Sequence, residues 1–370
     1  MINPDQQQRA VIAAAGTGGH VFPALAVALQ LIKLGWQVDW VGTREGRLES
    51  KVVPAHDIRL HSLEMTGIRG HGKIRLFKAP WQLFNAIKQA RQLLRDLQPD
   101  VVVTFGGYVC APLGIAAKSL GIALLTHEQN AVPGMTTRLL APFADKVLAG
   151  LPFTKKAIKK AVLTGNPLRE DVLQLAQHEV KEARTGPLRL LVVGGSLGAK
   201  VLNDTVPAAL ADIDTPLTVT HQCGGGNDKQ VSAAYGNCQQ HQVKVCDFIE
   251  QMGAAYQQAD LVICRAGALT VAELAVLGKA AILVPLPHAV DDHQTANAMT
   301  LVNAGGAVLL PQSELNEQSL AKLLQRLLQD PQQLWKMARF ARQSGRPQAT
   351  AAVTQCCLDA ANHNATEQVK

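Results

Sequence analysis

The chain has 370 residues, which is more than one hydrophobic core usually organises, so two domains of ordinary size are expected. Hydrophobic residues make up 47% of the chain and charged residues 18%, which excludes a disordered or collagen-like protein. The net charge of +7 is uneven, because residues 1–165 carry 20 Lys/Arg and 10 Asp/Glu whereas residues 166–370 carry 16 and 19. This asymmetry favours contact of the first half with a polyanion or an anionic membrane.

The location of the protein is constrained by its cysteines and apolar stretches. The seven cysteines are an odd number without metal-binding spacing, which indicates reduced thiols and a cytosolic location. Residues 1–9 are polar and lack the pattern of a secretory signal. The longest uncharged stretch, residues 101–117, is short and interrupted by Gly and Pro, so we expect no membrane-spanning helix.

Short apolar runs alternate with helical patterns along the whole chain. In the first half the runs are residues 10–15, 38–41, 101–105, 123–126 and 146–149. In the second half they are residues 188–193, 217–221, 243–246, 261–264, 281–284 and 307–310. Runs without alternation are typical of strands covered on both faces of a parallel sheet. Each half is therefore predicted to be a doubly wound α/β domain, with a turn-forming joint near Gly165 and a cleft between the domains.

A glycine loop follows the first predicted strand. It reads Gly16-Thr17-Gly18-Gly19-His20, and a helical pattern begins after it. A strand, a glycine turn and a helix start together expose backbone N–H groups, which favours binding of an anion. A tight turn that needs glycine only for its geometry is the alternative interpretation.

The segment 66–95 is basic and amphipathic. It contains seven Lys/Arg and no acid. On a helix that starts at Pro80, one face is aliphatic and should pack on the domain, while the neighbouring stripe is aromatic and basic. We expect this stripe and the apolar residues just before it to meet an anionic bilayer. The residues of this membrane surface are Ile74, Leu76, Phe77, Trp81, Phe84, Lys88 and Arg91.

Two alternatives to the membrane interpretation stay open. Nucleic acid would require aromatic residues spread out as a stacking platform, whereas here they cluster with aliphatic residues. We therefore expect no nucleic-acid partner. A solvated helix with a few core aromatic residues is the second alternative.

Two further motifs follow strands of the first half. Gly106-Gly107-Tyr108 is a glycine turn. It either binds a phosphate of the acceptor or is a turn without a ligand. His127-Glu128-Gln129-Asn130 ends the next strand, and strand ends of this type collect functional side chains.

The second half repeats the glycine loop after its own first strand, as Gly194-Gly195-Ser196-Leu197-Gly198-Ala199. No Gly-Lys-Ser/Thr follows either loop, which argues against a phosphate-binding NTPase. Asp39 lies inside the second strand rather than at its end, which argues against a dinucleotide dehydrogenase.

Two polar segments end strands later in the second half. Residues 265–273 follow the strand 261–264, and Thr270 and Glu273 have the spacing of a helix capping box. The sequence leaves a cap and a ligand site equally open there. Residues 291–295, Asp-Asp-His-Gln-Thr, follow the strand 281–284. They either supply functional side chains or form a solvated loop. The acidic pair Asp212 and Asp214 is interpreted as surface charge, and no metal site or other cofactor is expected.

Taken together, these motifs resemble the MurG family, the bacterial N-acetylglucosaminyltransferases that complete lipid II for peptidoglycan. The matching motifs run in family order from Gly16 to about residue 300, and as a set they are highly specific. One departure is Ala15, where the family usually has another glycine, which bears on how tightly the first turn closes.

The resemblance implies a GT-B fold with two Rossmann-like domains facing across a cleft. Residues 1–165 would bind the acceptor and the membrane, residues 166–346 would bind UDP-N-acetylglucosamine, and the helix in residues 347–370 would return to the first domain. The acceptor would be undecaprenyl-pyrophosphoryl-N-acetylmuramyl-pentapeptide, and the β-1,4 linkage would form with inversion. The protein would be peripheral at the cytoplasmic face of the inner membrane, and cell-wall synthesis or division proteins are the class of partner that the resemblance suggests.

The resemblance also implies roles for individual residues. His20 is the candidate general base, since a helix start favours its neutral form, and Glu128 is a second candidate. An acceptor-orienting or purely structural role of His20 stays open. Within the donor site, Ser196 and the start of the helix predicted at residues 268–273 would bind the diphosphate. Glu273 would bind the ribose, and the backbone of Ile249 would bind the uracil. The implied donor contacts are Thr17, Gly18, Gly19, Asn130, Arg169, Ser196, Ile249, Ala268, Leu269, Thr270, Val271, Ala272, Glu273 and Gln294.

Three rival functions share these features. They are another GT-B lipid glycosyltransferase, a UDP-sugar epimerase, and a membrane-recruited protein that only binds UDP-sugars. Release of UDP without an acceptor would indicate the epimerase, and donor binding without transfer would indicate the binding protein.

Overall fold

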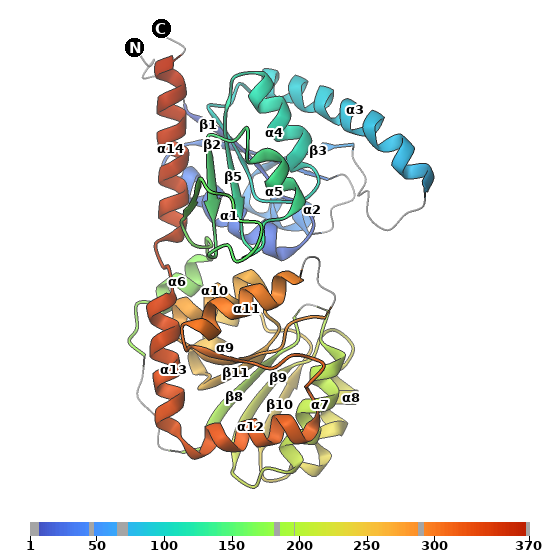
Figure 1. The fold of residues 1–370 in the computed structure, drawn as a ribbon, viewed down its shortest axis with the longest axis vertical. Helices are drawn as coiled ribbons and strands as arrows, with labels where there is room; N and C mark the ends of the chain where they lie inside the picture. Colours follow the sequence, from blue (N-terminus) through green and yellow to red (C-terminus); the bar gives the residue numbers. More distant parts are fainter. Residues whose placement is uncertain are drawn as a thin grey trace. The chain divides into compact units, whose positions relative to one another are not determined.

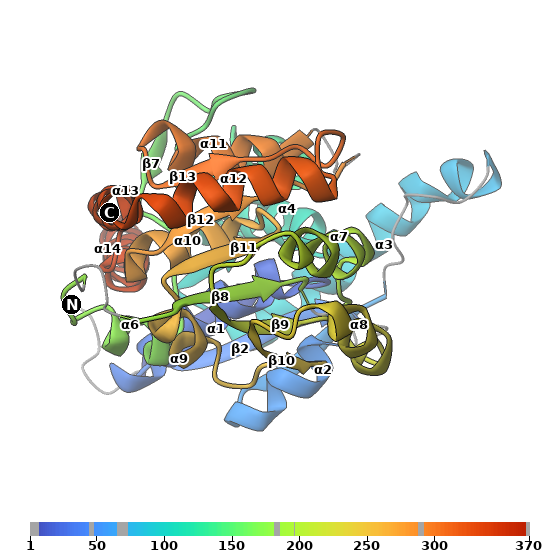
Figure 2. The same ribbon diagram turned by 90° about the horizontal axis from the view of Figure 1, so that it is seen from below.

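The computed structural model describes residues 7–43, 48–64, 73–180, 186–195, 197–287 and 292–367 (Figure 1). The chain forms two compact units: unit 1 comprises residues 1–169 and 348–370, and unit 2 comprises residues 170–347. In each unit helices cover both faces of one parallel sheet (Figures 1 and 2).

Unit 1 contains a seven-stranded sheet in the order β3-β2-β1-β4-β5-β6-β7. All neighbouring strands are parallel. The order reverses between β1 and β4, which is the switch point of a doubly wound sheet. The strands are β1 (Arg9–Ala13), β2 (Gln37–Thr43), β3 (Arg59–Leu63), β4 (Val101–Thr104), β5 (Ala123–Glu128), β6 (Lys146–Ala149) and β7 (Ala161–Leu163).

Two sets of helices cover this sheet. Helices α1 (Gly18–Lys33) and α14 (Ala349–Glu367) bury apolar side chains against the face that carries Ala10 and Ile12 of β1. Helices α3 (Lys73–Leu97), α4 (Cys110–Ser119) and α5 (Met135–Leu140) bury theirs against the face that carries Val11 and Ala13. The short α2 (Glu49–Val52) lies between β2 and β3 in the chain.

Unit 2 contains a six-stranded parallel sheet in the order β10-β9-β8-β11-β12-β13, which reverses between β8 and β11. Helices α7, α8 and α12 pack on one face of the sheet. Helix α9 contacts β8, and helix α13 contacts β12. Helix α10 contacts α9, α11 and α13. The strands are β8 (Leu188–Val193), β9 (Leu217–Gln222), β10 (Gln242–Cys246), β11 (Leu261–Cys264), β12 (Ala280–Leu283) and β13 (Ala307–Leu309). The helices are α6 (Glu170–Leu175), α7 (Lys200–Ala211), α8 (Asp228–Ala234), α9 (Met252–Gln258), α10 (Ala268–Leu277), α11 (His293–Asn303), α12 (Glu317–Gln329) and α13 (Pro331–Ser344).

The predicted strands and the doubly wound class are confirmed, but one predicted boundary is wrong. Helix α3 starts at Lys73 rather than at Pro80, which lies inside it. A proline removes one backbone hydrogen bond and disfavours a helix interior without forbidding it. The two predicted faces of the helix do hold, since Ala90 and Leu94 are buried while Trp81 and Phe84 are exposed.

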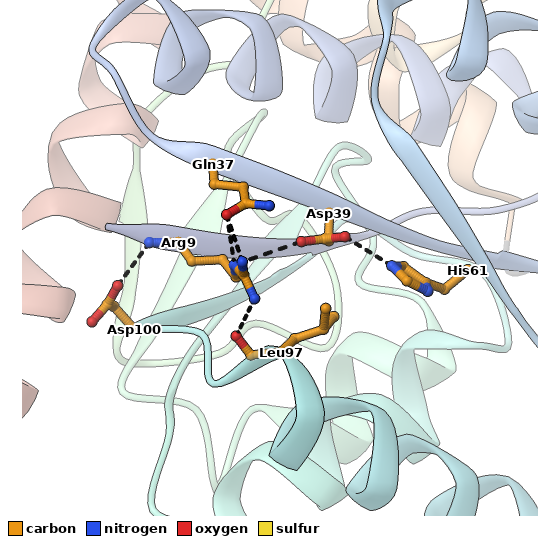
Figure 3. Close-up of polar contacts among 6 residues, drawn as sticks. All are labelled: Arg9, Gln37, Asp39, His61, Leu97 and Asp100. Carbon is orange, nitrogen blue, oxygen red and sulfur yellow. Dashed lines mark hydrogen bonds and ion pairs between the residues drawn. The ribbon is translucent and has the colours of Figure 1, made fainter. Parts of the chain in front are cut away.

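A polar network ties the end of α3 to the edge of the unit 1 sheet (Figure 3). The Asp39 side chain is only 2% exposed, and its oxygens lie 2.8 Å from Nε2 of His61 and 3.8 Å from Nε of Arg9. The guanidinium of Arg9 also donates to the carbonyl oxygen of Leu97, the last residue of α3 (Figure 3). The carboxylate that sequence reasoning placed inside β2 is therefore a structural ion-pair partner.

Candidate active site

In unit 1 the two glycine loops meet at the switch point of the sheet. The loop after β1 ends at Thr17 and leads into the first turn of α1, which contains Gly18 to His20, and the loop after β4 contains Gly106 to Tyr108. The backbone N–H of Ala15 donates to the carbonyl oxygen of Gly106 over 3.3 Å, so the two loops are in direct contact. Ligands of doubly wound sheets bind at such points, so these loops form the candidate half-site of unit 1.

Gly106 and Gly107 are required by close approaches as well as by their backbone. Their φ angles are +107° and +94°. A Cβ on Gly106 would lie 2.8 Å from Cδ2 of His20, and one on Gly107 would lie 2.8 Å from the carbonyl oxygen of Ala15. The first loop therefore closes with alanine at position 15 because position 107 has no side chain.

His20 lies in the first turn of α1 and is half-buried. Its Nδ1 lies 3.1 Å from the carbonyl oxygen of Ala15. Because a carbonyl oxygen can only accept, Nδ1 carries the proton of the neutral ring and Nε2 keeps its lone pair. A Cβ on Gly106 would lie 2.9 Å from this Nε2, so the lone pair sits where the two glycine loops meet. This is the protonation form that a general base requires.

Glu128 holds the loop that follows β5. Its Oε1 accepts from the backbone N–H and side-chain amide of Asn130 at 3.1 and 3.2 Å. Its Oε2 accepts from the N–H of Gly134 at 2.9 Å and from the hydroxyl of Thr137 at 2.7 Å. Both oxygens are thus engaged with the loop and the start of α5, which fits a loop-organising carboxylate better than a general base.

The neighbouring His127 binds the connector that leads out of unit 1. Its Nε2 lies 3.0 Å from the carbonyl oxygen of Gly165, and its Nδ1 lies 3.1 Å from Nε2 of Gln129. Asn166 donates to the carbonyl oxygen of Gln129 over 3.1 Å. Burial lowers the pKa of His127 to about 4. Sequence reasoning grouped this histidine with the site residues, whereas its contacts are those of a structural residue.

In unit 2 the loops after β8 and β9 are packed backbone to backbone. Gly195 and Gly198 have φ angles of +86° and +74°. A Cβ on Gly198 would lie 2.2 Å from the carbonyl oxygen of Cys223, so no other residue fits at that position. Ser196, the predicted diphosphate ligand of this loop, lies outside the described residues.

Helix α10 begins after Gly267, which has the extended backbone of an N-cap but makes no side-chain cap hydrogen bond. The capping-box interpretation of Thr270 and Glu273 is wrong, because both residues lie inside the helix rather than at its N-cap. Helix α10 therefore has Ala268 to Thr270 in its first turn, beside the switch point between β8 and β11. Val271 and Ala272 are buried in the next turn, and Glu273 is half-buried there.

The remaining predicted residues are distributed over both units. Gln294 lies near the start of α11 and accepts from the N–H of Leu286 at 2.9 Å. Ile249 is half-buried after β10, next to Phe248, whose side chain is 66% exposed. Arg169 is half-buried at the end of the first segment of unit 1.

Arg265, the first residue of the family motif after β11, does not point to a ligand. Its guanidinium donates to the carbonyl oxygens of Val284 and Pro285 and to the side chain of Gln312, over 2.8 to 3.2 Å. Burial lowers the pKa of this group. Arg265 therefore joins the loops that follow β11, β12 and β13.

The predicted membrane stripe is partly within the described residues. Trp81 and Phe84 are 68% and 59% exposed and stack on each other, and Lys88 is also exposed. Arg91 instead donates to the hydroxyl of Ser119. The side chains of Ile74, Leu76 and Phe77 lie outside the described residues.

A second exposed apolar group lies on and after α5 and was missed by sequence reasoning. Met135, Leu139 and Phe143 are 61%, 46% and 56% exposed. Helix α4 contacts both α3 and α5. The spacing of four residues between Met135 and Leu139 on α5 is the signal that could have identified this group. Among the described residues, no helix is long and apolar enough to span a membrane.

No metal centre is formed by the part of the chain that the structure describes, since no three His, Cys, Asp or Glu side chains come together there. Asp212 and Asp214 stay interpreted as surface charge.

Two family models match the chain. The glycosyltransferase family 28 N-terminal domain matches residues 10–149, and the glycosyltransferase family 28 C-terminal domain matches residues 189–353.

Individual relatives match almost the entire chain. A protein from Idiomarina loihiensis named UDP-N-acetylglucosamine--N-acetylmuramyl-(pentapeptide) pyrophosphoryl-undecaprenol N-acetylglucosamine transferase is 57% identical over 354 residues, covering 95% of this chain and 98% of the relative. A protein of the same name from Pseudoalteromonas translucida is 49% identical over 362 residues, covering 97% and 99%. The crystal structure of MurG from Acinetobacter baumannii is 41% identical, covers 95% of this chain and 99% of that one, and superposes with a TM-score of 0.83. The chain therefore has the GT-B fold and belongs to glycosyltransferase family 28, as a member of the MurG family of N-acetylglucosamine transferases.

Proposed function

We propose that the two units divide the substrates of this transferase between them. The reaction is the transfer of N-acetylglucosamine from UDP-N-acetylglucosamine to the lipid-linked N-acetylmuramyl-pentapeptide (lipid I), which yields lipid II. Residues 166–346 bind the donor. Residues 1–165, with the returning tail 347–370, bind the acceptor and the membrane.

The donor diphosphate is bound by residues 194–199 and the first turn of α10. Gly195 and Gly198 hold this loop in a backbone with positive φ, and the N-terminal end of α10 carries the positive end of the helix dipole, which favours an anion. Glu273 binds the ribose hydroxyls, and the backbone of Ile249 binds the uracil. The remaining donor contacts in this proposal are Thr17, Gly18, Gly19, Asn130, Arg169, Ser196 and Gln294.

Transfer proceeds by one in-line displacement with inversion at the anomeric carbon. The 4-hydroxyl oxygen of the acceptor forms a bond to that carbon while the bond to the UDP oxygen breaks. Nε2 of His20 takes the proton of the hydroxyl. The N-terminal end of α10 stabilises the negative charge that develops on UDP. Ala15 contributes by keeping the ring proton on Nδ1.

The observation that carries this assignment is the hydrogen bond between Nδ1 of His20 and Ala15, which leaves Nε2 as the acceptor nitrogen at the contact of the two glycine loops. Glu128 is the weaker candidate, because its two oxygens already accept four hydrogen bonds. The backbone of Gly106, Gly107 and Tyr108 binds the pyrophosphate of the acceptor, which places its sugar near His20.

The protein acts as a peripheral protein at the cytoplasmic face of the inner membrane, with anionic lipid as its partner. Trp81, Phe84 and Lys88 supply exposed apolar surface and charge, and Met135 and Leu139 of α5 supply further exposed apolar side chains. The test is co-sedimentation with phosphatidylglycerol vesicles. Replacing Trp81 and Phe84 by Ser should reduce binding several-fold, whereas unchanged binding would remove this surface from the account.

A transfer assay with UDP-N-acetylglucosamine and a synthetic lipid I analogue tests the function itself. We expect UDP to be released only when the acceptor is present. Release of UDP without acceptor would indicate a UDP-sugar epimerase instead. Binding of the donor with no transfer to the analogue would indicate a protein that only reads UDP-sugars.

A further inference from the structure

Gln222 lies between the loop after β8 and the loop after β10, which the proposed donor site assigns to the diphosphate and to the uracil. It is the last residue of β9, the strand between β8 and β10, and it is 3% exposed. The loop after β8 is assigned to the diphosphate, and the loop after β10, which contains Asp247 and Ile249, is assigned to the uracil. A side chain at the end of β9 can therefore contact both loops.

The carboxamide of Gln222 makes three hydrogen bonds to backbone groups of these loops. Its Oε1 accepts from the N–H of Gly195 at 3.1 Å. Its Nε2 donates to the carbonyl oxygen of Gly195 at 3.0 Å and to that of Asp247 at 2.8 Å. Both N–H groups of the amide are thus used. Because carbonyl oxygens cannot donate, the nitrogen must face them, and the orientation of the amide is fixed by its partners.

The same carbonyl oxygen of Asp247 also accepts from the N–H of Gly224 at 3.2 Å, and its carboxylate accepts from the N–H of Gly226 at 3.1 Å. The close approach of Gly198 to Cys223 completes the contact with the loop after β8. The loops after β8, β9 and β10 therefore form one hydrogen-bonded layer, in which the Gln222 side chain spans from the first loop to the third.

We propose that Gln222 is a positioning residue that sets the spacing between the diphosphate loop and the uracil loop without touching the substrate itself. This inference rests on the donor site proposed above. A ligand that spans both loops, such as UDP, depends on their spacing. A ligand that uses the loop after β10 without the loop after β8, such as uridine, does not.

The experiment measures dissociation constants of UDP and uridine by calorimetry with the full chain and two variants. In Gln222→Glu a carboxylate oxygen replaces the amide nitrogen and faces two carbonyl oxygens, so the two loops are pushed apart. We expect the dissociation constant of UDP to rise at least about tenfold and that of uridine to change by less than about threefold. The KM for UDP-N-acetylglucosamine should rise while the KM for the lipid I analogue stays unchanged.

Gln222→Met removes the three hydrogen bonds without adding repulsion, so it should weaken UDP binding less than Gln222→Glu does, and it carries the test if the Glu variant does not fold. Gln325→Leu is the matched control. Gln325 is exposed, and its side chain donates a hydrogen bond of 3.2 Å to the carbonyl oxygen of Asp212, which belongs to none of these loops. Equal losses for UDP and uridine, or no loss for UDP, would overturn the inference. Failure of the unaltered chain to bind UDP would instead overturn the donor site on which the inference rests.

Discussion

The imidazole of His127 lies between two groups that fix its proton, with Nε2 3.0 Å from the carbonyl oxygen of Gly165 and Nδ1 3.1 Å from the amide nitrogen of Gln129. The carbonyl accepts and the amide donates, so the ring is neutral with its proton on Nε2. Burial lowers the pKa of His127 to about 4, and it lowers the pKa of the fully buried His221 in unit 2 to about 4 as well.

These two histidines predict acid lability. In the unfolded chain an imidazole has a pKa of about 6.5, so between pH 6.5 and pH 4 the unfolded state binds more protons than the folded state. The free energy of unfolding should therefore fall as the pH falls through this window, by up to about 3 kcal/mol per histidine. Urea unfolding at several pH values measures this slope.

His127→Gln removes one of the two titrations and should flatten the slope between pH 6.5 and pH 4. His56→Gln is the matched control, because the side chain of His56 is exposed. An identical slope in His127→Gln and in the unaltered chain would contradict the buried, neutral state of His127.

The ion pair of Asp39 with Arg9 and its hydrogen bond with His61 should contribute strongly to the stability of unit 1 (Figure 3). Asp39→Asn leaves the charge of Arg9 without its buried carboxylate. We expect the free energy of unfolding to drop by about 3 kcal/mol, at the lower end of the range for buried pairs because Arg9 and His61 are partly exposed. Urea unfolding at neutral pH measures the change.

Asp204→Asn is the control for Asp39, because it breaks an exposed pair with Lys200 on α7. That pair should be worth less than about 1 kcal/mol. Similar losses in both variants would mean that burial of Asp39 adds nothing to its ion pair with Arg9.

Gly106→Ala should impair catalysis through His20. The added Cβ would lie 2.8 Å from the His20 ring, so the ring must move, and turnover should fall by more than about tenfold. Gly121→Ala is the matched control, because Gly121 also has a positive φ of +72° but no atom within 4 Å of an added Cβ. Both variants should lose about 1–3 kcal/mol of stability from backbone strain. Equal turnover in the two variants would show that the His20 contact does not matter.

Thr137→Val distinguishes the two interpretations of Glu128. If Glu128 organises the loop that presents Asn130, loss of the 2.7 Å hydrogen bond from Thr137 should lower turnover several-fold, and Glu128→Gln should act in the same range. Steady-state rates with the lipid I analogue measure both. Full turnover in Thr137→Val together with loss of activity by about a hundredfold or more in Glu128→Gln would make Glu128 the base.

The short apolar runs of the sequence were sufficient to predict most strands, because strands covered on both faces consist mainly of apolar residues. Strand β3, with the sequence Arg-Leu-His-Ser-Leu, was not among them, since it lies at the sheet edge and alternates polar and apolar residues. The glycine loops and His20 could be identified because their position directly after a strand is a local signal.

Other features depend on contacts that no local pattern contains. The start of α10 at Ala268 excludes a cap at Thr270, yet the spacing of Thr270 and Glu273 fits a cap equally well. Gln222 is the last residue of β9, and no sequence motif marks it. Its proposed role depends on contacts with two loops that are remote in sequence. The roles of Glu128 and His127 likewise follow from their hydrogen-bond partners, which only the folded chain brings together.

The central claim is that Nε2 of His20 accepts the proton of the attacking hydroxyl, and the rate of His20→Ala tests it most directly. Turnover with the lipid I analogue should fall by about a hundredfold or more, while the dissociation constant of UDP, measured by calorimetry on the same sample, stays within about twofold. Turnover equal to that of the unaltered chain, or a fall in turnover matched by an equal loss of UDP affinity, would contradict the account.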